Sequence, residues 1–280
     1  MLKQTQKFSS RQSMSKNTFE VFHYFDINGK NVQIHHHDFY ELYFFLSGDV
    51  TYLVEGQKYK LNSGDLLLIN PMELHQPIPS ENSSYERMVL WIDRNYLASL
   101  SQDGTDLASC FAHHKIVKTH YNNVFMRGRI AELFDLLNKE SHSMKFGSET
   151  YAKSLLEQLL IEVGRMVQQK RSSHDFVESS SLVARVISYI NINYGEDVSL
   201  DSLSEKFFVN KYYLSHEFSQ QMGVSVYKYL TLKRLSRAKE LLLEGVKASQ
   251  VATACGFHNY PTFFRMFKAE YGISPSKIYN

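Results

Sequence analysis

The sequence predicts an α+β protein of two domains, a β-rich domain followed by an all-helical C-terminal domain. The chain has 280 residues, which is enough for two separate cores. Short apolar segments separated by turn residues occupy the chain as far as residue 93, as in a small all-β domain. Beyond residue 124 the apolar residues recur at three-to-four spacing, which is typical of amphipathic helices.

The β-rich part is expected to form a small β-barrel or a β-sandwich, because its strands are short and follow one another at regular spacing. Five expected strands are rich in β-branched and aromatic residues: Glu41–Leu46, Val50–Val54, Tyr59–Leu61, Leu66–Ile69 and Tyr85–Asp93. Gly, Asn, Asp and Pro separate these segments, and such residues favour tight turns.

Two amphipathic helices are expected to flank the barrel. Their apolar positions are Ile130, Leu133, Phe134 and Leu137 in the first, and Leu155, Leu156, Leu159, Leu160 and Val163 in the second. These positions are more numerous than a helix that covers a barrel needs. We therefore expect at least one of the two helices to form the two-fold interface of a homodimer.

Composition sets the expected domain boundaries. Residues 1–19 are basic and contain no apolar stretch, which predicts an N-terminal arm rather than a secretory signal. The barrel and its helices follow as residues 20–170. Residues 171–181 are polar and Ser-rich, as in an interdomain linker, and residues 182–280 form the helical domain.

The helical domain contains the same unit twice. Matching residues stand 49 positions apart, in the pairs Leu214/Phe263, Phe218/Phe267, Gly223/Gly272, Val224/Ile273, Ser225/Ser274 and Lys228/Lys277. A helix, a short turn, a second helix and a Gly-ended exit thus appear in duplicate, which predicts two helix-turn-helix units. A long helix over Tyr227–Leu243 joins them. Such units place helices into the major groove of double-stranded DNA.

At this point the sequence resembles a known family. The motifs that carry the resemblance are Lys233-Arg234-Leu235-Ser236-Arg237-Ala238, Val251-Ala252-Thr253-Ala254-Cys255-Gly256-Phe257, Phe263-Phe264-Arg265-Met266-Phe267-Lys268 and Gly272-Ile273-Ser274-Pro275. Together they resemble the signature of the AraC/XylS family of bacterial transcription regulators, over roughly the last third of the chain. One departure is visible, because the family usually has an Arg soon after the Ser-Pro and this chain continues Lys277-Ile278-Tyr279-Asn280.

Charge and composition agree with a DNA-binding protein of the cytoplasm. Residues 182–280 contain 12 Lys and Arg against 8 Asp and Glu, so this segment is mildly basic while the whole chain carries only +2. The two cysteines, Cys110 and Cys255, form no Cys-x-x-Cys pair, so neither a disulfide framework nor a cysteine zinc site is expected. No apolar run approaches the length of a membrane span, so no membrane partner is expected.

The residues expected to contact DNA lie on the outward N-terminal face of each recognition helix. They are Lys211, Tyr212, Ser215 and His216 in the first helix, and Asn259, Tyr260, Thr262, Arg265 and Lys268 in the second. Arg265 can bind guanine with two hydrogen bonds, and Thr262 can touch a thymine methyl group or a phosphate. Lys268 and Asn259 are expected at phosphates, which position the helix without choosing a sequence.

The barrel contains a degraded metal-site motif. The spacing Gly29-x5-His35-x-His37-x3-Glu41-x6-Gly48 resembles the first cupin motif at every position. The second half, Gly64-x5-Asn70-Pro71-x-Glu73-x-His75, lacks the Gly after Pro, and its His comes one residue early. Three His and one Glu are possible ligands for Fe, Mn, Ni or Zn. Cupin-like sensor domains of this regulator family often keep such histidines without an enzyme's site, so we expect no metal, cofactor or catalytic residue.

A regulator needs an input, and the cupin-like barrel domain is the natural place for a small-molecule effector. We expect the effector at His35, His37, Glu41 and His75, which supply hydrogen bonds, and at Tyr43 and Trp91, which supply aromatic faces. A sugar suits this mixture of stacking and polar groups, which points to the control of metabolic or transport genes.

Three functions remain open at this point. The first is an effector-responsive transcription regulator, which is not an enzyme. The second is a metal-dependent cupin enzyme fused to a DNA-binding module. The third is a constitutive DNA-binding protein whose barrel only dimerises. The sequence does not identify the operator, nor does it say whether the protein activates or represses transcription. If it is an activator, RNA polymerase is expected as a further partner. The chain contains no P-loop, nucleophile elbow or dinucleotide fingerprint, so nothing favours other enzyme classes.

Overall fold

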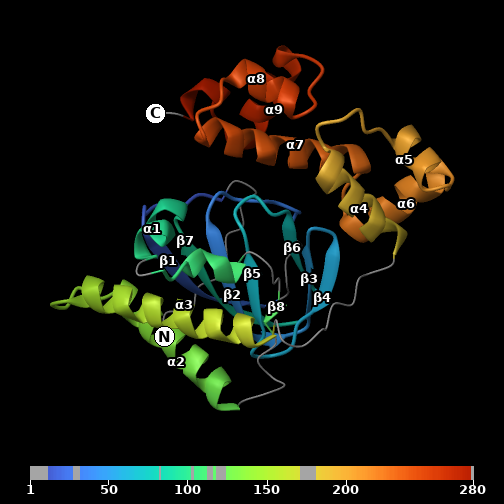
Figure 1. The fold of residues 1–280 in the computed structure, drawn as a ribbon. Coiled ribbons are helices and arrows are strands. Elements are labelled where there is room, and N and C mark those ends of the chain that lie inside the picture. Colours follow the sequence, from blue (N-terminus) through green and yellow to red (C-terminus); the bar gives the residue numbers. More distant parts are fainter. Residues whose placement is uncertain are drawn as a thin grey trace. The chain divides into compact units, whose positions relative to one another are not determined.

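The computed structural model describes residues 12–27, 32–81, 83–101, 104–111, 116–117, 124–170 and 181–278 (Figure 1). The chain divides into two compact units, and every helix from residue 182 onward belongs to the second. Most of the expected arm (residues 1–11), nearly all of the expected linker (residues 171–180) and Gly29 of the first cupin motif lie outside the described residues.

Within the described residues, the N-terminal unit contains two β-sheets. The larger sheet has the strand order β1-β7-β2-β5-β8, formed by β1 (Phe19–Asp26), β7 (Tyr85–Ile92), β2 (Tyr40–Gly48), β5 (Leu66–Ile69) and β8 (Ile116–Val117). The smaller sheet has the order β4-β3-β6, formed by β4 (Gln57–Lys60), β3 (Val50–Val54) and β6 (His75–Pro79).

Alternation along the central strands gives the larger sheet two different faces. On β2, Leu42 and Phe44 pack among the helices, whereas Tyr43 and Phe45 belong to a separate core between the sheets. The helices on the outer face are α1 (Arg94–Leu100), α2 (Val124–Ser141) and α3 (Ser148–Lys170), with a 3₁₀ turn, η1, at Leu107–Phe111 (Figure 1). The Phe44 ring stacks on that of Phe134 at 5.5 Å between centroids.

The two flanking helices are present, but their apolar residues have a different use from the one expected. All of the apolar positions that suggested a dimer interface, from Ile130 to Leu137 in α2 and from Leu155 to Val163 in α3, are buried in the helix–sheet core. Covering the outer face of the larger sheet therefore accounts for these residues without a second copy of the chain. Homodimerisation stays a prediction, but it needs other residues.

The five expected strands occur close to their predicted bounds, as β2, β3, β4, β5 and β7. The sequence interpretation did not single out β1, β6, β8 or the short helix α1. Strand β6 was not predicted because it contains Pro77 and Pro79, and proline is unfavourable in a central strand. It lies at the edge of the smaller sheet, where a missing backbone donor is tolerated.

The C-terminal unit is helical and repeats one motif, as predicted. Its helices are α4 (Leu182–Asn193), α5 (Leu200–Lys206), α6 (Lys211–Met222), α7 (Val226–Leu243), α8 (Ala248–Ala254) and α9 (Tyr260–Tyr271), followed by a 3₁₀ turn, η2, at Pro275–Lys277. Helices α5–α6 and α8–α9 form the two helix-turn-helix units, and α7 joins them. The predicted fold class, α+β with an all-helical C-terminal domain, is confirmed. No helix among the described residues has both the length and the apolar character needed to cross a membrane.

Equivalent caps fix the two recognition helices. The side-chain oxygens of Asn210 and Asn259 accept backbone N–H groups in the first turns of α6 and α9. At the other ends, Gly223 (φ 68°) and Gly272 (φ 77°) adopt the left-handed conformation that glycine allows. The duplication in sequence is therefore a duplication of helix boundaries.

The connecting turns differ between the two units. Gly256 takes a positive φ of 74° in the second turn, and Phe208 takes one of 54° in the first. The Phe208 side chain is 94% exposed, so no burial of its ring offsets the cost of this conformation, about 1–2 kcal/mol for an L-residue. The first turn is therefore strained where the second is not.

Gly48 provides a test of the barrel geometry, because it ends β2 with φ 119° and a Cβ there would lie 2.4 Å from the carbonyl oxygen of Ser84. Gly48→Ala should lower the free energy of unfolding by about 2 kcal/mol or more, through backbone strain and this clash. The control is Gly164→Ala in α3, where a Cβ meets nothing within 4 Å and a gain of about 0.5–1 kcal/mol is expected. Urea unfolding followed by the fluorescence of the single Trp measures both, and equal effects would contradict the strained turn.

Candidate functional site

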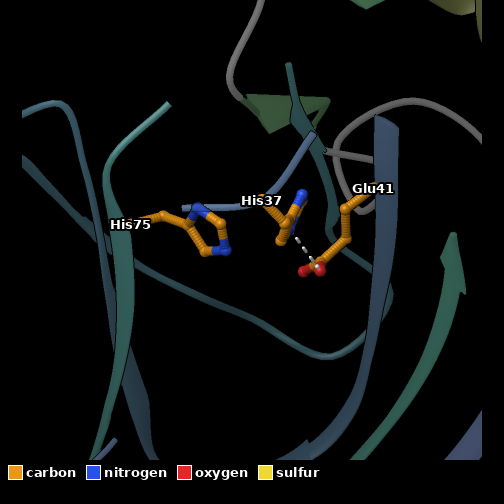
Figure 2. A group of neighbouring side chains, drawn as sticks. All are labelled: His37, Glu41 and His75. Carbon is orange, nitrogen blue, oxygen red and sulfur yellow. Dashed lines mark hydrogen bonds and ion pairs between the residues drawn. The ribbon is translucent and has the colours of Figure 1, made fainter. Parts of the chain in front are cut away.

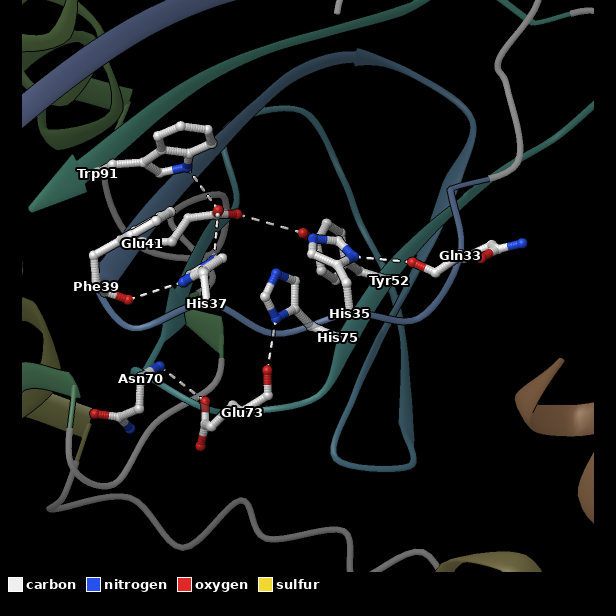
Figure 3. A network of polar contacts seen from close by, with 10 residues as sticks. All are labelled: Gln33, His35, His37, Phe39, Glu41, Tyr52, Asn70, Glu73, His75 and Trp91. Atoms are coloured by element: carbon white, nitrogen blue, oxygen red, sulfur yellow. Dashed lines mark hydrogen bonds and ion pairs between the residues drawn. The ribbon is translucent and has the colours of Figure 1, made fainter. Parts of the chain in front are cut away.

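Four of the side chains expected at the effector site meet inside the N-terminal unit. Glu41 is the second residue of β2, His37 lies just before that strand, His75 begins β6, and Trp91 lies near the end of β7 (Figure 3). All four are buried. Together with Tyr52 of β3 we call them the Glu41 cluster.

The Glu41 carboxylate is the centre of the cluster. Its Oε2 accepts a hydrogen bond from the Trp91 indole N–H at 2.9 Å and lies 3.2 Å from His37 Nε2. The Tyr52 hydroxyl donates to Oε1 at 3.5 Å. A buried carboxylate is stable only with such donors or a positive charge beside it. The cluster therefore surrounds Glu41 with groups from two other strands, β3 and β7, and from the segment before β2.

Backbone carbonyls fix the orientation of the histidine rings. Nδ1 of His37 lies 3.0 Å from the Phe39 carbonyl oxygen, and Nδ1 of His75 lies 2.8 Å from that of Glu73. A carbonyl oxygen can only accept, so each Nδ1 carries the proton and donates. In the neutral ring the lone pair is then on Nε2, which for His37 faces Glu41.

The turn before β6 brings His75 against His37. The Met72 N–H donates to the His37 carbonyl oxygen at 2.7 Å, and the Asn70 N–H donates to the Glu73 carboxylate at 2.9 Å. The rings of His37 and His75 meet edge to face at 4.8 Å between centroids (Figure 2). His75, which comes one residue early in the second motif, therefore still contacts His37 of the first motif.

Aromatic residues surround the polar groups. The His37 ring stacks on Phe39 at 3.9 Å, and the Trp91 ring lies 4.7 Å from the same Phe39 ring. Burial, together with the Glu41 carboxylate, raises the pKa of the Tyr52 hydroxyl well above its usual value. Tyr52 therefore stays protonated and available as a donor.

A second polar group lies between the sheets, around Arg87. The Arg87 guanidinium pairs with Asp26 and lies over two tyrosine rings, 4.2 Å from the centroid of Tyr85 and 4.9 Å from that of Tyr24. The Tyr85 hydroxyl in turn contacts that of Tyr43. The charge of Arg87 is thus balanced by a carboxylate and covered by aromatic faces.

The structure brings together most, but not all, of the expected effector residues. His37, Glu41, His75 and Trp91 form one cluster, and Tyr43 joins it through Tyr52, whose ring lies 5.0 Å from its own. His35 is buried, but its Nδ1 bonds the Gln33 carbonyl and the ring is outside the group formed by His37, Glu41 and His75. The segment 32–39 contains only an isolated bridge at His35, so the strand assumed there is wrong.

Sequence reasoning missed three residues that shape this region, namely Phe39, Tyr85 and Arg87. A signal for Arg87 was available, because it is one of two charged residues, with Glu86, in the otherwise apolar strand β7. A charge in such a strand is expected to have a buried partner. Its partner, Asp26, lies 61 residues away, and no pattern in the sequence connects the two.

The DNA-binding candidates lie where the helix-turn-helix interpretation predicted. In α6 and α9 the buried positions include Leu214, Phe218, Phe263 and Phe267. The opposite face is partly or fully exposed, and it includes Lys211, Tyr212, Ser215, His216, Asn259, Tyr260, Thr262, Arg265 and Lys268.

Two of these side chains also form structural contacts within the helical domain. Lys211 forms an ion pair with Asp201 of α5 at 3.0 Å, and Asn259 caps α9 through Thr262 N–H. Two exposed aromatic residues beside them, Phe208 and Tyr213, were not expected. The turn before α6 and the first residues of α6 therefore expose aromatic side chains, whereas α9 exposes Arg265 and Lys268.

Comparison with known families agrees with this architecture. The AraC-like ligand binding domain matches residues 21–160, which is half of the chain, and a helix-turn-helix domain matches residues 203–280. The protein belongs to the AraC family. It is a DNA-binding transcription regulator with a small-molecule-binding domain of cupin-like fold, as the sequence motifs implied.

Curated relatives of this AraC-family chain are also regulators. The HTH-type regulator YbfI of Bacillus subtilis, whose own function is uncharacterised, is 28% identical over 80% of this chain and 78% of that protein. The HTH-type transcriptional activator RhaS of Escherichia coli is 21% identical over 87% of this chain and 86% of its own length.

Solved structures give weaker matches. ToxT of Vibrio cholerae is 14% identical and covers 94% of this chain and 98% of its own, with a TM-score of 0.38. The C-terminal domain of AraT from Geobacillus stearothermophilus is 32% identical over 35% of this chain and 84% of its own, with a TM-score of 0.35.

Proposed function

We propose that this regulator responds to a small uncharged polyhydroxylated molecule, a sugar or sugar derivative, that binds at the Glu41 cluster. We also propose that the protein acts in the cytoplasm and controls metabolic or transport genes. The observation that carries this proposal is the buried Glu41 carboxylate, oriented by Trp91, His37 and Tyr52. A fixed carboxylate accepts hydrogen bonds from hydroxyl groups, and the neighbouring aromatic faces stack on the C–H faces of a sugar ring.

The distribution of charge favours an uncharged effector. Arg87 already pairs with Asp26, so an anionic ligand would compete with a carboxylate for that guanidinium. Glu41 would repel a second anion close by, since buried like charges interact strongly. A neutral molecule with several hydroxyl groups meets neither cost.

The effector proposal is tested by thermal unfolding of the full chain with a panel of pentoses, hexoses and their deoxy forms. At least one should raise Tm, because a ligand that binds only the folded state stabilises it. His37→Ala should abolish the shift and Trp91→Phe should weaken sugar affinity by about tenfold, near the value of one hydrogen bond to a charged group.

The matched control is His142→Ala, since among the described contacts the His142 side chain bonds only the carbonyl oxygen of Asn138 in α2. DNA binding without sugar should survive in all three variants. A panel without any shift, or a shift retained in His37→Ala, would contradict the proposal.

We further propose that the exposed faces of α6 and α9 contact operator DNA. Arg265 supplies the sequence-specific contact to guanine, and Lys268 contacts phosphate, because both are exposed on the basic face of α9. In α6, Tyr212 is 76% exposed and Lys211 is held by Asp201, so apolar contact contributes more there than charge does. Ser215, His216, Tyr260, Thr262 and Asn259 complete the two surfaces.

Arg265→Ala in the full chain should weaken binding to a specific promoter fragment by about 1–3 kcal/mol, because a bidentate base contact is lost. Gel-shift titration measures the loss on specific and on random DNA. The control is Arg165→Ala on α3, an exposed arginine outside the DNA-binding domain, which should bind both DNAs as the unchanged protein does. An equal loss on both DNAs would make Arg265 a phosphate contact.

We also propose that the protein acts as a homodimer that recruits RNA polymerase as an activator. The buried residues of α2 and α3 do not support the dimer, but two exposed apolar residues of α3 favour it. They are Tyr151 and Ile161, which are 48% and 39% exposed. A two-fold contact that covers them would bring two DNA-binding domains to paired half-sites.

Light scattering should report a dimer for the full chain and a shift toward monomer for the double variant Tyr151→Asp, Ile161→Asp, because buried carboxylates at an interface are costly. Lys145→Asp, an exposed change in the connection between α2 and α3, is the control and should leave the mass unchanged. A monomeric unchanged protein at tens of micromolar, roughly where weak interfaces are still populated, would contradict the dimer.

A further inference from the structure

We propose that His37, Glu41 and His75 bind one divalent transition-metal ion. One donor atom of each residue lies within 4.8 Å of the others, and all three residues are buried (Figure 2). This differs from the sequence expectation of no metal, which relied on the resemblance to sensor domains that keep such histidines without an enzyme's site. The inference is independent of whether the effector is a sugar.

The donor set defines the class of ion. Two imidazole nitrogens and one carboxylate oxygen suit Zn²⁺, Fe²⁺, Mn²⁺ or Ni²⁺, whereas Ca²⁺ and Mg²⁺ prefer oxygen ligands alone. Three protein ligands leave at least one coordination position for water or another small molecule.

Both histidines are oriented as metal ligands are. A metal-bound His commonly donates its other ring N–H to a carbonyl or carboxylate, which fixes the tautomer and turns the free lone pair to the ion. Here Nδ1 of His37 and of His75 donate to the carbonyl oxygens of Phe39 and Glu73, at 3.0 and 2.8 Å. The two Nε2 atoms are therefore the donors presented to Glu41.

The carboxylate is held from outside in the same way. Trp91 N–H donates to Oε2 of Glu41, and the Tyr52 hydroxyl donates to Oε1 (Figure 3). Hydrogen bonds of this kind orient ligating carboxylates and tune the affinity of metal sites. They also fix Glu41 before any ion binds, which lowers the entropy that binding must overcome.

One distance already matches a metal site. His37 Nε2 lies 3.2 Å from Glu41 Oε2, and two ligands on one tetrahedral ion with bonds of about 2.0–2.2 Å are separated by roughly 3.3–3.6 Å. His75 needs to approach by about 1 Å, which a small side-chain rotation provides. A lone pair and a carboxylate this close are stabilised by a positive charge between them, and a divalent ion supplies it.

The experiment tests for the ion directly. The full chain is stripped with a chelator and titrated with Co²⁺, whose visible absorption reports coordination, and then with Zn²⁺ by displacement. We expect one ion per chain. Glu41→Gln and His75→Gln should each lower affinity by at least about tenfold, and Trp91→Phe by about tenfold, as loss of an outer hydrogen bond does.

His142→Ala is again the control and should bind Co²⁺ as the unchanged protein does. Circular dichroism on each variant distinguishes lost ligands from lost fold, and Trp91→Phe keeps the test valid if a ligand variant unfolds. No stoichiometric binding tighter than roughly 100 µM, or binding that all the cluster variants retain, overturns the metal site.

The sugar panel, repeated on stripped and Zn²⁺-loaded protein, tests the effector separately. A sugar-dependent Tm shift in protein that binds no metal would overturn the metal site alone. Metal binding without any sugar response would support the site while contradicting the proposed effector.

Discussion

The burial of one carboxylate, Glu41, organises the interior of the N-terminal domain. A charged group removed from water is tolerated only if its surroundings replace the lost hydration. Trp91 from β7 and Tyr52 from β3 donate hydrogen bonds that provide part of this replacement, and His37 from the segment before β2 lies beside the carboxylate. Each comes from a different part of the chain, so satisfying one side chain ties the larger sheet to the smaller one.

The two faces of the larger sheet differ, because side chains alternate between them along each strand. Neighbouring residues on β2, such as Leu42 and Tyr43, belong to different cores, one under the helices and one between the sheets. The helix-facing core is mainly apolar, with the buried His23 paired to Glu86 on that side. The core between the sheets contains the Glu41 cluster and Arg87, whose polar groups pair with one another.

The fold class, the duplicated unit and most of the polar site could be predicted from local patterns. Asn210 and Gly223 mark a helix by residue type alone, and their counterparts recur at a fixed offset. The pairing of Arg87 with Asp26, the edge strand β6 with its prolines and the burial of the α2 and α3 apolar faces could not be predicted. Each depends on which segments meet in three dimensions, and apolar spacing is the same for a helix facing a sheet as for one facing a partner.

The turn at Phe208 makes the exposed surface of the first helix-turn-helix unit different from that of the second. An aromatic ring stands in a left-handed turn of the first unit, beside Tyr212, where the second unit has Gly256 and a basic helix. If these two surfaces contact DNA as proposed, each DNA-binding domain has a defined direction along the duplex. Reversing that direction would place the aromatic surface at bases that suit an arginine. The proposed contacts therefore imply a non-palindromic half-site for each domain.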